Sequence, residues 1–160
     1  MSLLNEPLME DRVRPDWVDY NGHMNDAAYA NVFSLAVDRL MEELGITASF
    51  RDVHQYSIYT LETHLCYLAE AHQGQELHVT VQLLDHDQKR LHVFFVMLDN
   101  KGNRLATSEQ MLMGMNMEEE RPAPFPTQIE TSVKALADSQ KDKPTPDEAG
   151  RVIKIRRRPK

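Results

Sequence analysis

The stretch Trp17-Val18-Asp19-Tyr20-Asn21-Gly22-His23-Met24-Asn25 leads directly into a segment with strong helical periodicity, 27–44. Apolar residues recur in that segment at three- and four-residue spacing and form one stripe: Val32, Phe33, Ala36, Val37, Leu40 and Leu44. Gly45 follows, where a left-handed C-cap residue is common. We therefore predict a long amphipathic helix over about 27–44, whose apolar face has to be buried against another element.

The loop ahead of this helix carries more polar side chains than a helix start requires. One Asp, Asn, Ser or Thr is enough for an N-cap. Here five polar residues fall within eight positions: Asp19, Asn21, His23, Asn25 and Asp26. Gly22 among them allows the backbone a positive φ. The surplus predicts a functional site, with a simple turn or cap as the alternative role for Asp19.

The rest of the chain reads mainly as strands. A short strand is predicted over 7–14, and four longer ones over 56–69, 75–85, 90–98 and 104–116. The connectors between these four are short and turn-like, which predicts an antiparallel meander. A weaker helix is predicted over 127–139, followed by a polar tail from 141 to 160. One apolar helix stripe and one apolar sheet face are buried most simply when the sheet wraps the helix.

The predicted fold class is therefore α+β, with a five-stranded antiparallel sheet around one central helix in a single domain, 1–140. A five-stranded sheet has two open edges, and pairing with a second copy would protect them. With 160 residues, 41% of them hydrophobic and 27% charged, the chain has the composition of an ordinary globular domain.

Charge and composition exclude several partners. The net charge of −7 argues against a nucleic-acid partner, and no apolar run reaches the ~20 residues of a membrane helix. The single Cys66 and the lack of a signal peptide favour a cytoplasmic location. The seven histidines lack a ligand spacing, so we expect no metal and no cofactor. Six basic residues crowd the last ten positions, as a solvated tail or as a phosphate contact.

The loop over 19–25, with Tyr29 in the first helical turn, resembles the hotdog-fold acyl-CoA thioesterases of the 4-hydroxybenzoyl-CoA type. The order of elements matches that family over about 5–120. Three further segments are similar to the betainyl-CoA thioesterases of carnitine breakdown: Tyr56-Ser57-Ile58-Tyr59-Thr60-Leu61-Glu62-Thr63-His64, Lys89-Arg90-Leu91-His92 and Ala106-Thr107-Ser108-Glu109-Gln110-Met111.

The resemblance implies a hotdog enzyme that hydrolyses an acyl-CoA thioester, most specifically betainyl-CoA to glycine betaine and CoA, as a homodimer or homotetramer. Asp19, three residues before Gly22, matches the position of the family's catalytic carboxylate. It would attack the thioester carbonyl itself or deprotonate an attacking water. Asn21 and Asn25 would orient water or the acid, or act as loop and cap residues. His23 would hold the loop or carry a proton.

A betainyl group would require a pocket for a trimethylammonium ion, which aromatic ring faces bind well. The candidates are Trp17, Tyr20, Tyr29, Phe33, Tyr56 and Tyr59, with Glu62 as the negative charge; ordinary core packing is the alternative. The backbone of the turn at Tyr56-Ser57 is the candidate oxyanion donor. Lys89, Arg90 and Arg104 are candidates for the CoA phosphates, or else surface ion pairs.

Two other functions stay open at this stage. A hotdog enoyl-CoA hydratase or dehydratase also pairs an Asp with a downstream His, but such enzymes usually have Pro where this chain has Gly22. A non-catalytic hotdog protein that binds an acyl-CoA would tolerate the loss of the acid, whereas Asp19 is present.

Overall fold

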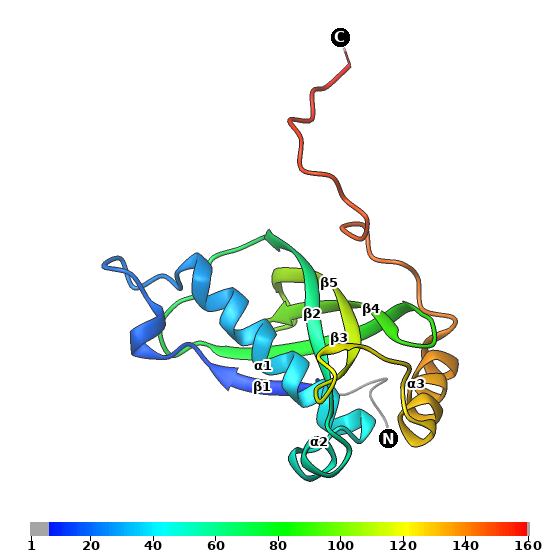
Figure 1. Ribbon diagram of the computed structural model, residues 1–160. Coiled ribbons are helices and arrows are strands. Elements are labelled where there is room, and N and C mark those ends of the chain that lie inside the picture. Colours follow the sequence, from blue (N-terminus) through cyan, green and yellow to red (C-terminus); the bar gives the residue numbers. More distant parts are fainter. Residues whose placement is uncertain (1–6, 160) are drawn as a thin grey trace.

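The structure is a computed structural model that describes residues 7–159 (Figure 1). After β1 (Met9–Arg12) and a single 3-10 turn (Pro15–Trp17) comes the long helix α1 (Asp26–Leu44), then the short helix α2 (Ala48–His54). The strands β2 (Tyr56–Tyr67), β3 (Glu76–His86), β4 (Arg90–Leu98) and β5 (Arg104–Asn116) follow. A two-residue strand, β6 (Arg121–Pro122), and a helix, α3 (Thr127–Gln140), complete the elements.

The strands form one antiparallel sheet in the order β1-β3-β4-β5-β2, with β6 beside β5. The sheet curls around α1, which confirms the predicted α+β hotdog architecture (Figure 1). Asn25 caps the start of α1 and Gly45 ends it with φ 100°, so both predicted helix boundaries lie within one residue of the observed ones. The predicted helix at 127–139 is α3.

The predicted four-strand meander is wrong in one respect. Strand β2 does not pair with β3: it pairs along its length with β5, and β1 lies next to β3 instead. Residues 68–75 form no hairpin because their backbone pairs with the polar loop before α1. The Met24 N–H donates to the Ala71 carbonyl at 2.8 Å, and His23 bridges to His72.

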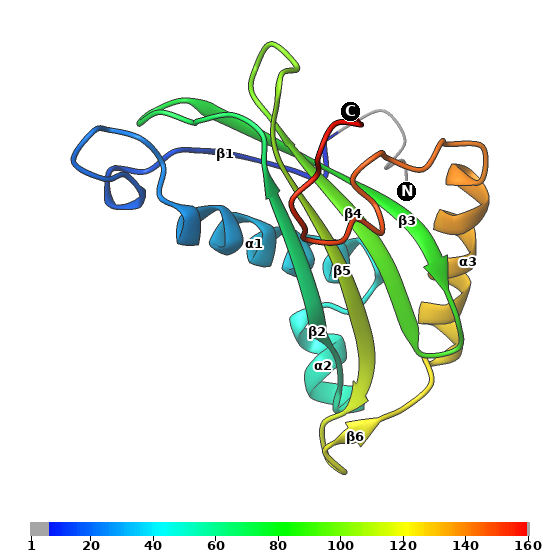
Figure 2. The same ribbon diagram turned by 90° about the horizontal axis from the view of Figure 1, so that it is seen from above.

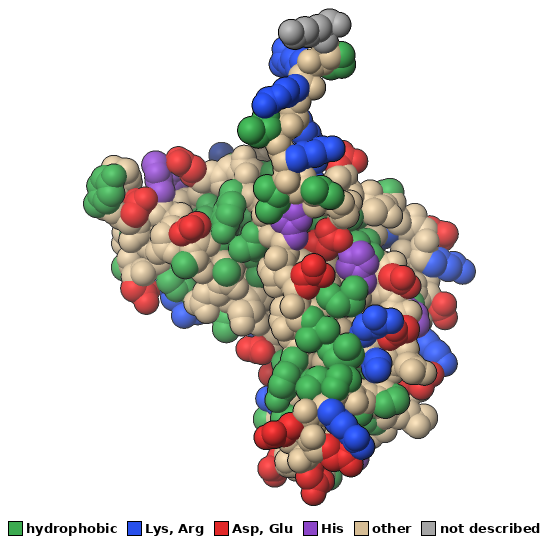
Figure 3. Space-filling model, turned by 45° about the horizontal axis from the view of Figure 1, so that its top comes forward, with side chains coloured by type: hydrophobic (Ala, Val, Ile, Leu, Met, Phe, Trp, Pro, Cys, Tyr) green, Lys and Arg blue, Asp and Glu red, His purple; other side chains and the backbone are tan. Residues whose placement is uncertain are grey.

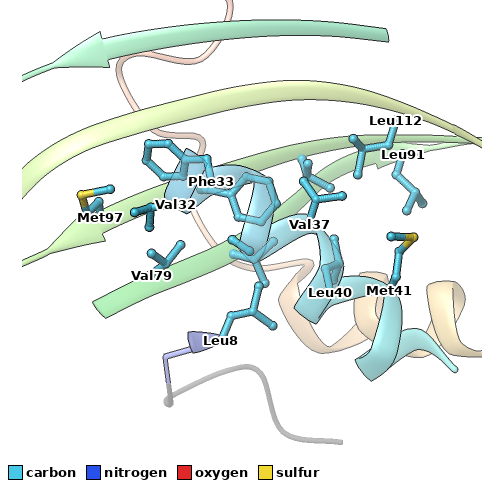
Figure 4. Packing of buried hydrophobic residues seen from close by; sticks show 14 of the residues in the cluster. Leu8, Val32, Phe33, Val37, Leu40, Met41, Val79, Leu91, Met97 and Leu112 are labelled. Atoms are coloured by element: carbon cyan, nitrogen blue, oxygen red, sulfur yellow. The ribbon is translucent and has the colours of Figure 1, made fainter. Parts of the chain in front are cut away.

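The core lies between α1 and the inner face of the sheet (Figure 4). Phe33 of α1 packs against Phe95 of β4 with ring centroids 6.2 Å apart. Leu91 and Met97 of β4 and Leu112 of β5 point the same way and are almost fully buried. Each such side chain contributes roughly 1.5–3 kcal/mol by leaving water. The predicted apolar stripe of α1 is thus the face that the sheet covers.

Helix α2 was not predicted from the sequence. Its N-cap is Thr47, whose hydroxyl accepts from the Phe50 N–H, but none of its seven residues is buried. A helix with no buried face leaves no apolar periodicity to detect. No described helix is long and apolar enough to cross a membrane.

The two edges of the sheet differ. Beyond the four residues of β1, helix α3 lies beside the C-terminal half of β3, where the Gln140 side chain hydrogen-bonds the edge backbone. Its Oε1 accepts from the Leu83 N–H at 2.7 Å, and its Nε2 donates to the Val81 carbonyl at 3.0 Å. On the opposite edge, the twelve residues of β2 pair only with β5 among the described strands. That edge remains open.

Residues 141–159 contain no helix or strand, and they cross the outer face of the sheet, opposite α1 (Figure 2). Arg104 at the start of β5 holds this tail through two hydrogen bonds to the Glu148 carboxylate, at 3.0 and 2.8 Å. Beyond Gly150 the chain rises away from the sheet (Figure 1). The tail is therefore attached to the domain at a defined place.

Candidate active site

The polar loop before α1 is a tight hairpin whose backbone closes on itself. Val18 and Met24 bridge across it, and the Asp19 N–H donates to the His23 carbonyl at 2.9 Å. The Gly22 N–H donates a hydrogen bond to the Asp19 carbonyl at 2.9 Å, and Gly22 has φ 75°. A residue with a side chain would be strained at that φ, which explains the glycine at the centre of the motif.

The Asp19 carboxylate is held by this loop through one oxygen. Its Oδ1 accepts from the Asn21 N–H at 2.8 Å and from the His23 N–H at 3.2 Å. Its Oδ2 has no hydrogen-bond or ion-pair partner within residues 7–159, and Asp19 is exposed. One oxygen is therefore fixed in place while the other is free to meet a substrate or a water molecule.

The other polar residues of the loop shape it. Asn25 accepts from the Ala28 N–H at 2.9 Å and donates to the Trp17 carbonyl at 2.9 Å, so its side chain is occupied as an N-cap. His23 Nδ1 lies 3.4 Å from the Glu70 carboxylate, and its ring meets the edge of the His72 ring. Asn21 is exposed. Catalytic roles for these three residues stay predictions.

Three tyrosines lie at this end of the molecule. Tyr20, at the tip of the loop, is 97% exposed. Tyr29 is buried, and burial raises the pKa of its hydroxyl, which donates to the Ala69 carbonyl at 3.3 Å. Tyr67, at the end of β2, packs edge-on against Tyr29 with centroids 5.2 Å apart, and its hydroxyl donates to the Asp26 carbonyl. Sequence reasoning missed Tyr67 because it ends a strand far along the chain.

The structure does not bring the remaining aromatic candidates to this loop with an open ring face. Trp17 is buried, and the Arg14 guanidinium already lies over its ring at 4.5 Å. Phe33 is a core residue. Tyr56 is buried at the opposite end of β2 from Tyr67, where its hydroxyl donates to the Ala123 carbonyl at 2.9 Å.

Tyr59 and Glu62 are exposed residues of β2. Tyr59 lies near the start of the strand and Glu62 near its middle, so neither is at the Tyr67 end. Both stand on the open edge of the sheet. Within one chain the predicted aromatic pocket is therefore divided along β2.

Two of the three predicted phosphate contacts are already paired with carboxylates. Lys89 and Arg90 lie at the β3–β4 turn, at the far end of the sheet from Tyr67. Arg90 Nε donates to Asp87 at 2.7 Å. This bond, together with hydrogen bonds from the Lys89 and Arg90 backbone, lowers the pKa of Asp87 to about 2. Arg104 is paired with Glu148. We therefore find two of the three cations occupied by ion pairs.

A buried polar pair on β5 also escaped prediction. By register, Ser108 and Gln110 face α1 together with Leu112. The Gln110 Nε2 donates to the Ser108 hydroxyl at 3.0 Å, but the Gln110 Oε1 is buried without a partner in the described part of the chain. An unpaired buried acceptor costs about 1–3 kcal/mol, so it calls for an explanation by ligand, water or partner. The signal in the sequence was two polar residues at alternate positions of an apolar strand.

Comparison with known proteins identifies the family. The model of the thioesterase-like superfamily matches residues 13–134, which include the loop, α1 and the whole of the sheet beyond β1. The chain belongs to this superfamily. This confirms the resemblance that the loop over 19–25 indicated.

In residues 7–159, no three His, Cys, Asp or Glu side chains are placed to hold a metal ion.

Several proteins that the chain resembles are named for a CoA ester or were solved with CoA. It is 45% identical to the betainyl-CoA thioesterase of Pseudomonas aeruginosa, over 90% of this chain and 91% of that protein. It is 35% identical to the L-carnitine dehydrogenase/betainyl-CoA thioesterase of Rhizobium meliloti, over 91% of this chain and 29% of that longer protein. A Staphylococcus aureus protein solved in complex with CoA aligns with a TM-score of 0.88 and 32% identity, over 92% and 94% of the two chains.

Proposed function

We propose that this protein hydrolyses betainyl-CoA to glycine betaine and CoA. The observation that carries the proposal is the Asp19 carboxylate, fixed through Oδ1 and free at Oδ2, at the start of α1 in a chain 45% identical to a betainyl-CoA thioesterase. We also propose a cytoplasmic location for this protein, because its single cysteine, the half-buried Cys66, is free.

Asp19 can act in thioester hydrolysis by either of two routes. In one route, Oδ2 takes a proton from a water molecule that adds to the thioester carbonyl. In the other, Oδ2 adds to the carbonyl itself and forms a mixed anhydride, which water then hydrolyses. Either way the C–S bond breaks, and the CoA thiolate leaves and is protonated. Label in Asp19 after a single turnover in heavy-oxygen water would establish the anhydride route, because water that attacks the Asp19 carbonyl carbon of the anhydride leaves its oxygen there.

The site is completed, in this proposal, by a second copy of the chain. The open β2 edge exposes Tyr59, Leu61 and Tyr67 at 48%, 55% and 51%. Antiparallel pairing of two β2 strands places the start of one beside the end of the other. It would therefore bring Tyr59 of the partner subunit toward Tyr67, and cover an apolar edge that a single chain leaves in water. We infer a homodimer built on β2, in which each site uses residues of both subunits.

The acyl pocket then has the chemistry that a trimethylammonium group requires. Tyr20 and Tyr67 offer open aromatic surface beside the Asp19 loop. Tyr59 and Glu62 of the partner subunit add a further ring and a carboxylate. A cation over such a face gains about 0.5–2 kcal/mol, depending on how far it is desolvated. The gain should distinguish a betainyl group from an uncharged group of the same shape.

Thiol release tests the proposal. Wild type should release CoA from betainyl-CoA faster than from tert-butylacetyl-CoA, which has a carbon in place of the nitrogen. Asp19→Asn should lower kcat by about a thousandfold, within the range for loss of a catalytic acid or base. Asp16→Asn, an exposed acid three residues before Asp19, is the matched control and should leave kcat unchanged. An Asp19→Asn enzyme as active as the control would refute the assignment.

A further inference from the structure

We infer that the basic C-terminal segment, residues 151–158, binds the nucleotide phosphates of CoA. The inference rests on the proposed function, because it assigns the distal part of the same substrate to a place on this chain. It also replaces the phosphate site that the sequence placed at Lys89, Arg90 and Arg104, two of which are ion-paired.

The segment starts from a fixed point. The Arg104–Glu148 pair holds the chain just before it, and the Gly150 N–H donates to Glu109 Oε1 at 2.8 Å. The other oxygen of Glu109 lies 2.7 Å from His92 Nε2, so the acceptor is itself held in place. The segment thus leaves the sheet from the outer face of β5, one strand from the open edge.

The basic segment lies close to the end of the molecule that carries the Asp19 loop. A cleft of about 240 Å³ has Cys66 and Tyr67 of β2 on one side and Arg151, Lys154 and Arg156 on the other. Tyr67 is the residue whose hydroxyl contacts the Asp26 carbonyl at the first turn of α1. The three cations therefore stand at the end of β2 where the Asp19 loop lies, on the outer face of the sheet.

The segment carries a concentrated cluster of positive charge without ion-pair partners in the described part of the chain. Six of the 18 basic residues lie in the last ten positions, and none of the 25 acidic ones does. No side-chain ion pair within residues 7–159 involves Arg151, Lys154 or Arg156. Cations from several other elements are paired, namely Arg12, Arg14, Arg90, Arg104, Arg121 and Lys134. Figure 3 shows the blue side chains of the segment standing clear of the body.

Phosphate is the anion that fits this arrangement. Guanidinium groups bind phosphate oxygens with paired, charge-assisted hydrogen bonds, and several of them together match the multiply charged nucleotide of CoA. The catalytic end itself is acidic, with Asp16, Asp19, Asp26 and Glu70 around it. A polyanionic substrate would be repelled there unless a nearby positive strip attracted its phosphates. The segment at the end of β2 supplies that strip.

The test compares two thioesters on two variants of the full chain. The variant Arg151→Ala/Lys154→Ala/Arg156→Ala removes the strip. The control Lys101→Ala/Lys141→Ala/Lys143→Ala removes the same charge from exposed lysines outside it. The strip variant should raise KM for betainyl-CoA about tenfold, with kcat unchanged, as expected for three exposed charge contacts. Its kcat/KM for the betainyl N-acetylcysteamine thioester, which has no nucleotide, should equal that of wild type.

Salt gives a second readout, because added salt should raise KM for betainyl-CoA in wild type more than in the strip variant. The inference is overturned if the strip variant behaves like the control, if both thioesters are affected equally, or if only the oligomeric state changes. Calorimetry with CoA alone separates this inference from the proposed function. Were wild type to hydrolyse no thioester, weaker CoA binding by the strip variant would still support the inference, and equal or absent binding would refute it.

Discussion

The two edges of this sheet are finished in opposite ways. On the β3 side, a four-residue β1, helix α3 and the Gln140 amide satisfy the backbone and exclude another strand. On the β2 side, twelve residues of strand stay open, with Tyr59, Leu61 and Tyr67 half exposed. A long, apolar open edge is a liability in a protein that acts alone.

Under the proposed function, the catalytic and binding residues lie toward one edge of the sheet. The Asp19 loop, Tyr67 and the basic segment all lie toward the open edge or its end. We propose that α3 prevents pairing on one side, and that a second copy joins on the other side and completes the acyl pocket.

The largest effect is expected from placing a charge on the open edge. Leu61→Glu should dissociate the dimer, because two carboxylates would face each other across the paired strands. Activity should fall to near background while the circular dichroism spectrum of the fold is retained. Sedimentation and thiol release measure both. Val53→Glu, an equally apolar exposed site on α2, is the control and should change neither. A monomer with full activity would show that one chain holds a complete site.

The next effect is on selectivity at the same edge. Tyr67→Leu should lower kcat/KM for betainyl-CoA about tenfold, which corresponds to the loss of one cation–aromatic contact. The value for tert-butylacetyl-CoA should change little, because that acyl group carries no charge. Tyr67→Phe keeps the ring and should resemble wild type with both. Equal losses on both substrates would assign Tyr67 to packing alone.

A smaller and purely structural effect is expected on the closed edge. Gln140→Ala leaves the Leu83 N–H and the Val81 carbonyl without partners, at a cost of about 1–3 kcal/mol. Thermal unfolding should show Tm lower by several degrees, at roughly 2–4 °C per kcal/mol for a chain of this size. The dimer and kcat should be unaffected. Gln128→Ala, exposed on α3, is the control. Loss of the dimer instead would mean that the β3 edge is the interface.

The smallest effect is local and depends on pH. The hydrogen bond from Arg104 holds the pKa of Glu148 below its ordinary value, so the pair holds the tail above about pH 4.5. This contribution is lost as the pH falls through the lowered pKa, because protonated Glu148 no longer attracts Arg104. The protection of the Gly150 amide against hydrogen exchange, measured relative to the intrinsic exchange rate at each pH, should therefore decrease on acidification. Glu148→Gln should show the low protection already at neutral pH, unlike the exposed control Glu118→Gln. An unchanged Gly150 would show that Glu109 alone holds the tail.

The sequence was most informative where structure is local. The apolar stripe of α1, its caps at Asn25 and Gly45, and the alternating strand β3 each follow from periodicity and capping, and the structure confirms them. The order of strands was not local. The position of β2 beside β5 depends on the contact of residues 68–75 with the Asp19 loop, which no pattern within either segment indicates.

The candidate site, too, could be predicted only where its residues are close together in the sequence. Asp19 and its loop could be proposed as the site because polar residues are concentrated there beyond the needs of a cap. Trp17 was misjudged because its ring face is taken by Arg14, and Tyr67 was missed because only the fold brings it to Tyr29. For Arg90 and Arg104 the structure shows the surface ion pair that the sequence offered as the alternative. The partner of Arg90 is a near neighbour in sequence, Asp87, but Glu148 approaches Arg104 only in the folded chain.

Subunit complementation tests most directly whether each site uses residues of both copies. Asp19→Asn and Tyr59→Ala homodimers should each be poorly active on betainyl-CoA. After unfolding and refolding of an equal mixture, about half the dimers are mixed, and each of these regains one intact site. We predict recovery of about one quarter of wild-type activity. Activity equal to the mean of the two homodimers would contradict the account, because each site would then be built from a single chain.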